Sequence, residues 1–479
     1  MKKLAFALVP LLLASSALAR PATQQGADRL NQVFQTYLGQ GAQVVSVTAN
    51  GDVYDLTIDA QPLIALGQDA GALGSVTPLE LQLTDHGDGT WGVSLDQAIS
   101  IDLSMPKALD LQEKIASLSF NGTFDEKLMA FTQSNSAFSG LTLSETIYAP
   151  DVPPQTIEMT IDAGTMQSTA RAAAAGGTDF DATFTATGLT ETMITPALDG
   201  QPAMPITIKA QSLSQTMAGS QIMGAEIFQL ISWFTSHSDE AAMTADKAGL
   251  KAALTSAMPF FGALQGTGTV SMLSVDTPMG ALGIEKLGFA IALNGAVPEG
   301  KFAQGFAISG LTLPADLVPE WAAPLVPQSL TLDVQVTDFH PAAAMAVALS
   351  ALDLPDASAT GPEFDAKLLT ALLPKGTVTV GLNPGALTGV GYQLTYEGAL
   401  VAGPDTELPT GHATITLIGV DGLMAALQAA PDDMKAQAMM GFGMAQGMAK
   451  VEGDKLIWEI DAATPGAFSI NGMSLMGGN

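Results

Sequence analysis

Apolar and polar residues alternate along most of this chain, in short runs separated by Gly, Pro, Asn and Asp. Clear examples are Ile157 to Ile161, Ile206 to Ala210, Leu330 to Val336 and Ile415 to Ile418. A period of two places successive side chains on opposite faces of a β-strand, and turn residues at this spacing are typical of hairpins. The pattern predicts a chain made mainly of antiparallel β-hairpins.

Three hairpins can be placed from their turn residues. Asn50-Gly51 separates two alternating runs over 44–58, and a Gly/Asp turn separates the runs over 79–83 and 91–95. Near the end of the chain, Asn471-Gly472 lies between two apolar runs. Gly and Asn tolerate the positive φ angles of a two-residue turn, so each site predicts a reversal of the chain.

A helical period replaces the alternation in several segments. Apolar residues three and four apart predict helices over 24–39, 223–234, 239–257, 341–351 and 421–449. Ser238 is the expected N-cap of the helix at 239–257. Pro431-Asp432-Asp433 is an internal start signal, which predicts a Met-rich helix at 432–449. The expected fold class is α+β and β-dominated, with duplicated, strongly twisted antiparallel sheets and short helices that could curl into a groove.

Two segments that lie far apart in the chain contain the same short sequence motifs in the same order, at an offset of 170 to 173 residues. The first contains Glu113-Lys114-Ile115, Asn121-Gly122, Ser139-Gly140-Leu141-Thr142-Leu143 and Pro154-Gln155. The second contains Glu285-Lys286-Leu287, Asn294-Gly295, Ser309-Gly310-Leu311-Thr312-Leu313 and Pro327-Gln328. A looser third copy has Gly188-Leu189-Thr190 and Pro205. Such self-similarity indicates an internal duplication, in which Asn-Gly is the expected turn, Gly-Leu-Thr-Leu the start of a strand, and Pro-Gln the start of its return strand.

The duplication suggests a division of the chain. Residues 1–19 are expected to be a signal peptide, with Lys2-Lys3, an apolar core and an Ala17-Leu18-Ala19 cleavage signal. An N-terminal β-rich half follows at 20–214, then a helical connector at 215–262 and a C-terminal β-rich half at 263–479. The expected location is the periplasm, with secretion as the alternative and no membrane span after cleavage. The chain has no cysteine, so burial alone must hold the fold.

The net charge and the charged-residue content exclude some classes of binding partner. The formal net charge is −29, and Lys and Arg form no run that could neutralise phosphates, which excludes nucleic acid. The same charge disfavours adhesion to anionic lipid headgroups. Only 14% of residues are charged and the mean hydropathy is +0.30, whereas ordinary soluble domains contain about a quarter charged residues. Either strands are buried on both faces, or a groove exposes apolar surface.

None of the candidate motifs has the residues and spacing that catalysis or metal binding would need. The histidines His86, His237, His340 and His412 are widely scattered, which gives no local metal site. Ser104-x-x-Lys107 has Pro106 inside it and a strand-like context, so activation of the serine is not expected. The loop at 85–89 lacks a second calcium ligand and fits a hairpin turn. The expectation is a protein that is not an enzyme, with no cofactor and no metal site.

The Met-rich segment leaves several alternatives open. Met440, Met444 and Met448 would share one helix face, where thioethers could fill a core, form an adaptable contact surface, cover a ligand or bind copper(I). A core or a contact surface is the favoured interpretation.

The signal peptide, the Gly-Leu-Thr hairpins, the strand-then-Ala-helix units and the terminal Ile-Asn-Gly-Met-Ser-Leu at 470–475 resemble an exported alphaproteobacterial family, the domain of unknown function 2125. The resemblance covers nearly the whole mature chain and brings no catalytic residues. In architecture alone, the repeated units are similar to AsmA-like envelope proteins, whose curved β-sheets form lipid-carrying grooves.

The expected function is therefore to bind or shield an apolar, lipid-like ligand in a β-sheet groove. The alternative is a structural scaffold or adhesion-type protein that docks an envelope partner through its surface, and an enzyme is the third choice. The candidate wall residues are alternating apolar positions of the repeat strands, which a sealed core would explain equally well: Leu141, Leu143, Ile157, Leu311, Leu313 and Leu330.

Overall fold

The computed structural model of the protein describes residues 20–38, 44–66, 73–150, 152–195, 204–237, 239–353, 361–406, 408–464 and 466–476. The expected signal peptide at 1–19 and the expected N-cap Ser238 lie outside these residues.

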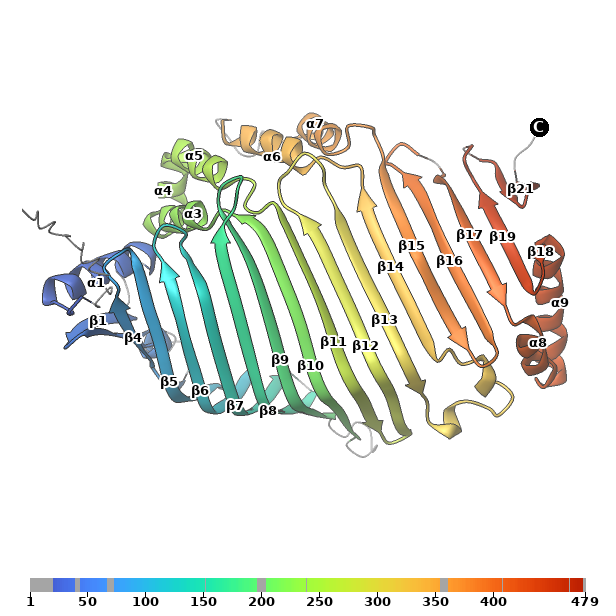
Figure 1. Ribbon diagram of the computed structural model, residues 1–479, viewed down its shortest axis with the longest axis horizontal. Helices are drawn as coiled ribbons and strands as arrows, with labels where there is room; N and C mark the ends of the chain where they lie inside the picture. The colour runs from blue at the N-terminus through green and yellow to red at the C-terminus, as the bar shows by residue number, and fades with distance from the viewer. Residues whose placement is uncertain are drawn as a thin grey trace, which may run out of the picture.

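One antiparallel sheet of 21 strands forms the body of the molecule (Figure 1), which confirms the expected β-dominated α+β class. Neighbouring strands follow chain order from β5 to β17, flanked by β4, β2 and β1 at one end and by β19, β20 and β21 at the other. The strands are β1 (Val45–Asn50), β2 (Val53–Ile58), β3 (Leu73–Val76), β4 (Leu79–Asp85), β5 (Thr90–Met105), β6 (Leu109–Asp125), β7 (Ala130–Ala149), β8 (Val152–Ala172), β9 (Thr178–Thr195), β10 (Met204–Ile222), β11 (Ala263–Thr277), β12 (Gly280–Asn294), β13 (Phe302–Thr312), β14 (Ser329–Thr337), β15 (Val378–Gly389), β16 (Tyr392–Ala402), β17 (Thr410–Ile418), β18 (Lys450–Glu452), β19 (Lys455–Asp461), β20 (Phe468–Ile470) and β21 (Met473–Met476).

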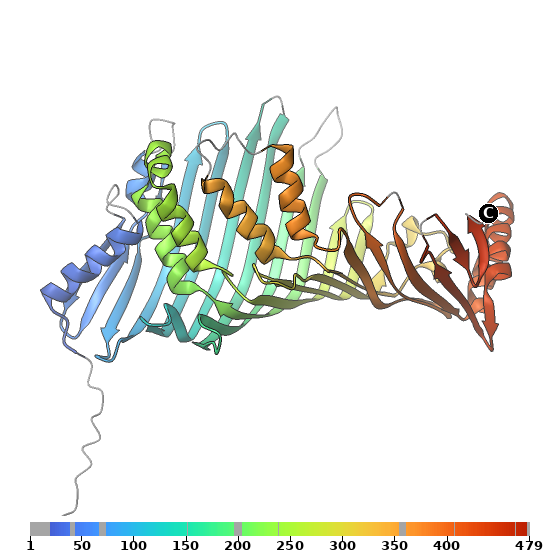
Figure 2. The ribbon, with the colours of Figure 1, turned by 90° about the horizontal axis from the view of Figure 1, so that it is seen from above.

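Short helices border the sheet. In Figures 1 and 2, α3 to α7 lie along the edge where the upper strand ends meet, α1 lies at the N-terminal end, and α8 and α9 lie at the C-terminal end. The helices are α1 (Gln24–Leu38), α2 (Gln61–Leu66), α3 (Gly224–Ser236), α4 (Glu240–Ala245), α5 (Lys247–Ala257), α6 (Pro341–Ser350), α7 (Pro362–Leu372), α8 (Val420–Gln428) and α9 (Asp432–Met448).

The N-terminal end has a compact core. Helix α1 packs on β1, and Ala27, Val47, Tyr54 and Leu56 form a buried cluster with Leu83 and Val93. At the free edge of β1, the Asn31 side chain pairs with the backbone groups of Val47. It donates to the Val47 carbonyl at 2.9 Å and accepts from the Val47 N–H at 2.8 Å. An amide that pairs with an edge strand in this way blocks further strand pairing at that position.

The centre of the sheet has no comparable core. Among the described residues from β6 to β16, the buried apolar side chains within strands are three alanines, Ala182, Ala186 and Ala210. The whole chain exposes 28208 Å². A compact monomer of this mass would expose about 17,000 Å². The central sheet is therefore a single layer.

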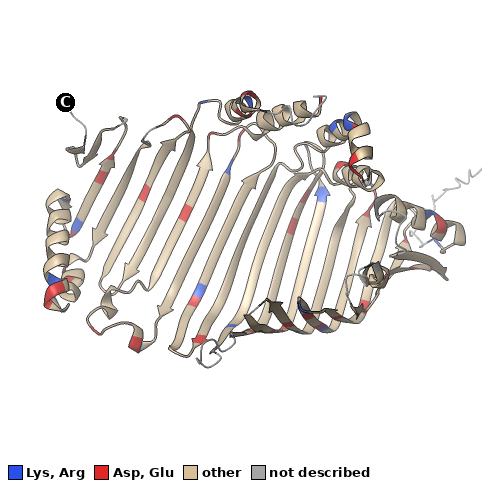
Figure 3. Cartoon of the chain, turned by 180° about the vertical axis from the view of Figure 1, so that it is seen from behind, with Lys and Arg blue, Asp and Glu red and all other residues tan. Residues whose placement is uncertain are grey.

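A crease crosses the strands from β6 to β13. One residue per strand lies in it, and φ is positive on every second strand: +61° at Gly140, +68° at Gly188, +50° at Met272 and +65° at Gly310. The ladder pairing is interrupted in this row and resumes in the same register on either side. Figure 3 shows the lower ends of the N-terminal strands turned out of the plane of the sheet. The crease residues are Ala116, Gly140, Asp162, Gly188, Gln211, Met272, Glu285 and Gly310.

The glycines of the repeated phrase thus have a different role from the expected one. Gly140 and Gly310 lie inside β7 and β13 rather than before a strand. Both positions are crowded, because an added Cβ would lie 2.9 Å from the Ala116 Cβ at Gly140 and 2.5 Å from the Glu285 Cβ at Gly310. Asn121-Gly122 lies within β6, so the expected turn is wrong there, whereas Asn294 ends β12 before a loop. Both Pro-Gln pairs are at the start of the return strand, in β8 and just before β14.

Other predicted elements are confirmed or corrected. The hairpins at Asn50-Gly51, 79–95 and Asn471-Gly472 are present. The segment 215–222, expected as part of the connector, continues β10, and β10 pairs directly with β11, so the sheet runs unbroken between the two halves. The helix expected over 239–257 is two helices, because Asp246 interrupts it and caps α5.

Candidate functional site

One face of the central sheet is apolar. Directly paired residues of antiparallel strands share a face, so register assigns each side chain to one side. Above the crease, one row has an apolar residue or glycine on each strand from β6 to β17 and on β19: Leu118, Phe138, Gly164, Ala186, Leu213, Val270, Leu287, Ile308, Leu330, Leu387, Leu394, Leu417 and Leu456. We call this side of the sheet the apolar face.

Further rows on the apolar face expose large side chains to solvent. Phe289 is 38% exposed and Phe306, its partner across β12 and β13, is 40% exposed. Monomeric proteins rarely leave contiguous apolar patches of this kind uncovered. Between β8 and β14, all of whose paired positions in these rows are described, the rows contain no charged residue. The exposed members are Met166, Met217, Phe289, Ile291, Phe302, Phe306, Leu332 and Leu400.

Glycines hold aromatic rings flat on this face. A Cβ added at Gly164 would lie 2.2 Å from the Phe138 ring, and one added at Gly268 would lie 2.0 Å from the Phe289 ring. Each glycine faces the phenylalanine across the ladder, so the ring lies over the glycine backbone. This cross-strand packing shields backbone and turns the face into a smooth apolar surface.

The opposite face of the same strands is small and polar. Gln167, Thr183, Thr216 and Thr267 are paired in sequence from β8 to β11, and the Thr216 and Thr267 hydroxyls are 2.7 Å apart. We call this side the polar face. Figure 3 shows that charged residues are sparse along the strands themselves. The central sheet is thus amphipathic.

The six predicted wall residues are all half-buried. Leu141 pairs with Ile115 and Ile161 directly below the crease, and the register places Leu311 and its partner Ile284 in the same row. Leu143 and Ile157 follow in the next two rows, paired with Met159 and Met193, respectively. Leu313 lies just after β13, and Leu330 lies above the crease on the apolar face.

Sequence reasoning missed the exposed members of the apolar face. The signal was present in β12, where Phe289, Ile291 and Leu293 alternate with Gly288, Ala290 and Ala292. Alternation alone identifies two unlike faces. Exposure depends on whether another layer covers the apolar one, which the pattern does not specify.

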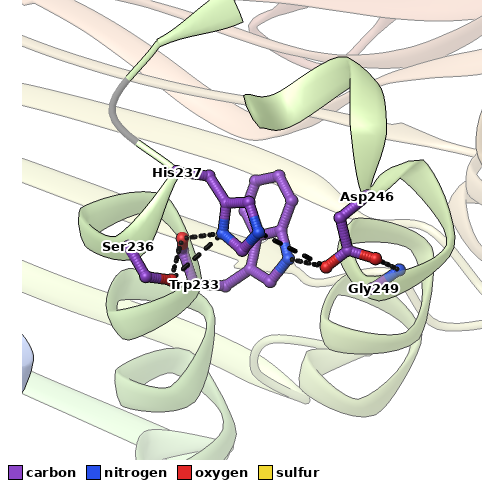
Figure 4. A network of polar contacts seen from close by, with 5 residues as sticks. All are labelled: Trp233, Ser236, His237, Asp246 and Gly249. Atoms are coloured by element: carbon purple, nitrogen blue, oxygen red, sulfur yellow. Dashed lines mark hydrogen bonds and ion pairs between the residues drawn. The ribbon is translucent and has the colours of Figure 1, made fainter. Parts of the chain in front are cut away.

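A serine, a histidine and a carboxylate meet between α3 and α5 (Figure 4). His237 Nε2 lies 3.4 Å from Asp246 Oδ2, and His237 Nδ1 lies 3.0 Å from Ser236 Oγ and 2.8 Å from the Trp233 carbonyl. A carbonyl only accepts, so Nδ1 carries the proton and donates to it. The Ser236 hydroxyl also donates to the Trp233 carbonyl, at 2.9 Å, so it has no free base to activate it.

This network connects α3 to α5. The Trp233 indole N–H donates to Asp246 at 3.0 Å, and the His237 ring stacks on Trp233 with centroids 4.2 Å apart. The indole hydrogen bond, together with that from the Gly249 N–H, holds the pKa of Asp246 below its ordinary value. Asp246 is also the cap of α5, so one carboxylate joins the end of α3 to the start of α5.

The other candidate motifs have local partners. Ser104 donates to Asp110 at 2.6 Å, and Lys107 lies in the following turn. The loop at 85–89 is the β4–β5 turn, in which Asp85 and Asp88 accept backbone N–H groups from Gly87 and Thr90. Within the described ranges, no group of three or more His, Asp or Glu side chains could hold a metal ion. No helix in the described part of the chain is long and apolar enough to cross a membrane.

The methionines of α9 lie mostly at the surface. Met440 and Met444 are each 66% exposed, and Met434 is 50% exposed, so these three side chains do not fill a core. The helix is joined to β19 by a hydrogen bond, in which the Trp458 indole N–H donates to the Ala445 carbonyl at 2.8 Å.

Comparison of the chain with protein-family models, curated proteins and solved structures finds no match in any of the three.

Proposed function

We propose that this protein is a non-enzymatic periplasmic protein of the cell envelope that binds a lipid-like ligand on the apolar face of its central sheet. The observation that carries the proposal is the set of large apolar side chains, 38–49% exposed, that stand in register on that face with no charge among them.

The physical chemistry favours acyl chains as the ligand. Each methylene group that leaves water contributes about 0.8 kcal/mol, and flat phenylalanine rings with flexible methionines accommodate a chain without fixing its position. Binding of this kind needs no polar contact in the floor of the site. With a net charge of −29, the protein repels anionic headgroups, so the binding free energy has to come from the acyl chain.

The test compares two adjacent residues of β10. Met217 is on the apolar face and Thr216 is on the polar face, and both side chains are exposed. We expect Met217→Glu to weaken binding of a fluorescent fatty acid at least about tenfold, because the bound chain would bury an unpaired carboxylate. Thr216→Glu adds the same charge on the other side of the same strand and should leave the affinity unchanged within about twofold.

Mass spectrometry of protein purified from its own envelope provides the second measurement. Co-purifying lipid that disappears in Met217→Glu and remains in Thr216→Glu supports the proposal. Lipid-free protein that also fails to bind the fluorescent fatty acid would refute it. That result would favour the alternative, a scaffold whose apolar face docks an envelope protein.

A further inference from the structure

The polar face contains a hollow of about 760 Å³ in the middle of the sheet. Two neighbouring rows from β8 to β14 form it. One has Gln167, Thr183, Thr216, Thr267, Ala290, Gly305 and Asp333, and the other has Thr169, Asp181, Ala218, Gln265, Ala292, Ala303 and Gln335. Seven strands at about 4.8 Å spacing make the hollow about 29 Å long. Its volume is in the range of established ligand sites.

The floor of the hollow is flat because its side chains are small. Ala218, Ala290, Ala292, Ala303 and Gly305 project at most a methyl group each, and they occupy the central strands. This floor offers a ligand apolar contact without the bulk that covers the opposite face.

Long polar side chains stand at both ends of the hollow, with Gln167 on β8 and Gln335 on β14, while Gln265 on β11 lies between Ala218 and Ala292. Within the described part of the chain, the amides of Gln167, Gln265 and Gln335 make no side-chain hydrogen bond, although each carries two donors and an acceptor. The two carboxylates of the hollow have partners: Asp181 is paired with Arg171 at 3.0 Å, and Asp333 accepts from Asn383 at 3.0 Å.

Charge excludes the simplest ligands. Among the described residues, Lys301 is the one cationic side chain that lines the hollow, so a polyanion would find no cluster of positive charge. A metal ion would find two carboxylates on different strands, each already engaged. The free groups are amides and hydroxyls, which suit a neutral ligand that both donates and accepts hydrogen bonds.

We infer that the hollow is a second binding site, for a neutral glycan segment. A sugar ring presents C–H groups on its faces and hydroxyl groups around its rim, and this distribution complements a surface on which alanines lie beside glutamines and threonines. An acetamido group would add a methyl for the floor and an amide for the glutamines. This site does not rest on the proposed lipid function, since successive side chains of the same strands point to opposite faces of the sheet.

The test uses calorimetric titration of the mature protein with the tetrasaccharide of N-acetylglucosamine. The double variant Gln265→Ala/Gln335→Ala removes hydrogen-bonding groups from the hollow, and Ala292→Leu fills the space above the alanines. Phe306→Glu, on the apolar face and outside the hollow, is the matched control. We expect each polar-face variant to weaken binding at least about fivefold, since it removes one or two hydrogen bonds or blocks the floor. The control should bind as the wild type does.

Three results would overturn the inference. They are the absence of binding up to about 10 mM tetrasaccharide, equal affinity in all variants, or tighter binding of an anionic heparin tetrasaccharide than of the neutral one. Far-ultraviolet circular dichroism of each variant distinguishes a lost site from a lost fold, and Ala292→Leu retains every polar group if the glutamine variant misfolds.

Discussion

The N-terminal end and the centre of the sheet use the same alternating strands with different results. At the N-terminal end, α1 covers the apolar side of β1 and β2, so Ala27 is fully buried and Val47 is 2% exposed. In the centre, Phe289 and Phe306 occupy equivalent alternating positions, yet they are 38% and 40% exposed. The difference is the second layer, which the described part of the chain provides at one end and not in the middle.

This contrast separates stability from function. A covered strand contributes its apolar side chains to the free energy of folding, whereas an uncovered strand keeps that surface available to a ligand or a partner. Hydrogen bonds between strands and cross-strand contacts then have to hold the central sheet together. We expect substitutions at the two places to affect different measurements.

The largest effect is expected at the N-terminal core. Leu56→Ala, at a side chain that is 5% exposed, should lower the free energy of unfolding of this end by about 3 kcal/mol. Phe306→Ala, at 40% exposure, should cost about 1 kcal/mol while reducing fatty-acid binding. Hydrogen exchange of β2 and β13 measures the two losses of stability, and titration with the fluorescent fatty acid measures the loss of binding. Equal costs would mean that the centre is covered in solution, and the contrast would fail.

Next in size is the crease. Gly188→Ala should destabilise the sheet by about 1–2 kcal/mol, because φ is +68° and the new Cβ would press on the Asp162 carboxylate. Gly453→Ala is the control, since φ is +63° there but nothing lies within 4 Å of an added Cβ. Thermal unfolding of both variants measures the difference. If Gly453→Ala costs as much as Gly188→Ala, crowding within the crease plays no part.

A smaller effect of opposite sign is expected on β11. Met272 adopts φ of +50° at the crease with its side chain 56% exposed, so Met272→Gly should stabilise the sheet by up to about 1 kcal/mol. Melting temperature is the readout. Destabilisation would show that the exposed thioether has contacts that outweigh the backbone cost.

The smallest effect concerns the helices beside the sheet. Because the pKa of Asp246 is lowered in the folded state, its contribution is present above the ordinary carboxyl pKa and is lost as pH falls through the folded value. Trp233 fluorescence should therefore change in a transition that lies below the ordinary carboxyl pKa. Asp246→Asn should abolish that transition. An unchanged titration in the variant would assign the signal to another carboxylate.

Particular residues mark the limit of what the sequence predicts. Asn50-Gly51 and Asn471-Gly472 were recognised as turns because local chemistry alone decides them. Asn121-Gly122 carries the same two residues inside β6, where long strands on both sides impose an extended backbone. Alternation selects the wall residues, of which five lie in strands, while Leu313 follows the end of β13. Phe289, Ile291 and Phe306 were missed because exposure is a property of neighbouring layers.

The sequence by itself determined the β-dominated class, the alternation of two unlike faces and the repeated glycine phrase, because each depends on residues close together in the chain. The tertiary structure decided three further features. It aligned Gly140, Gly188 and Gly310 into one crease, it joined both halves into a single sheet through β10 and β11, and it left the apolar face without a second layer. These depend on strand register and on the packing of distant segments, which no local pattern encodes.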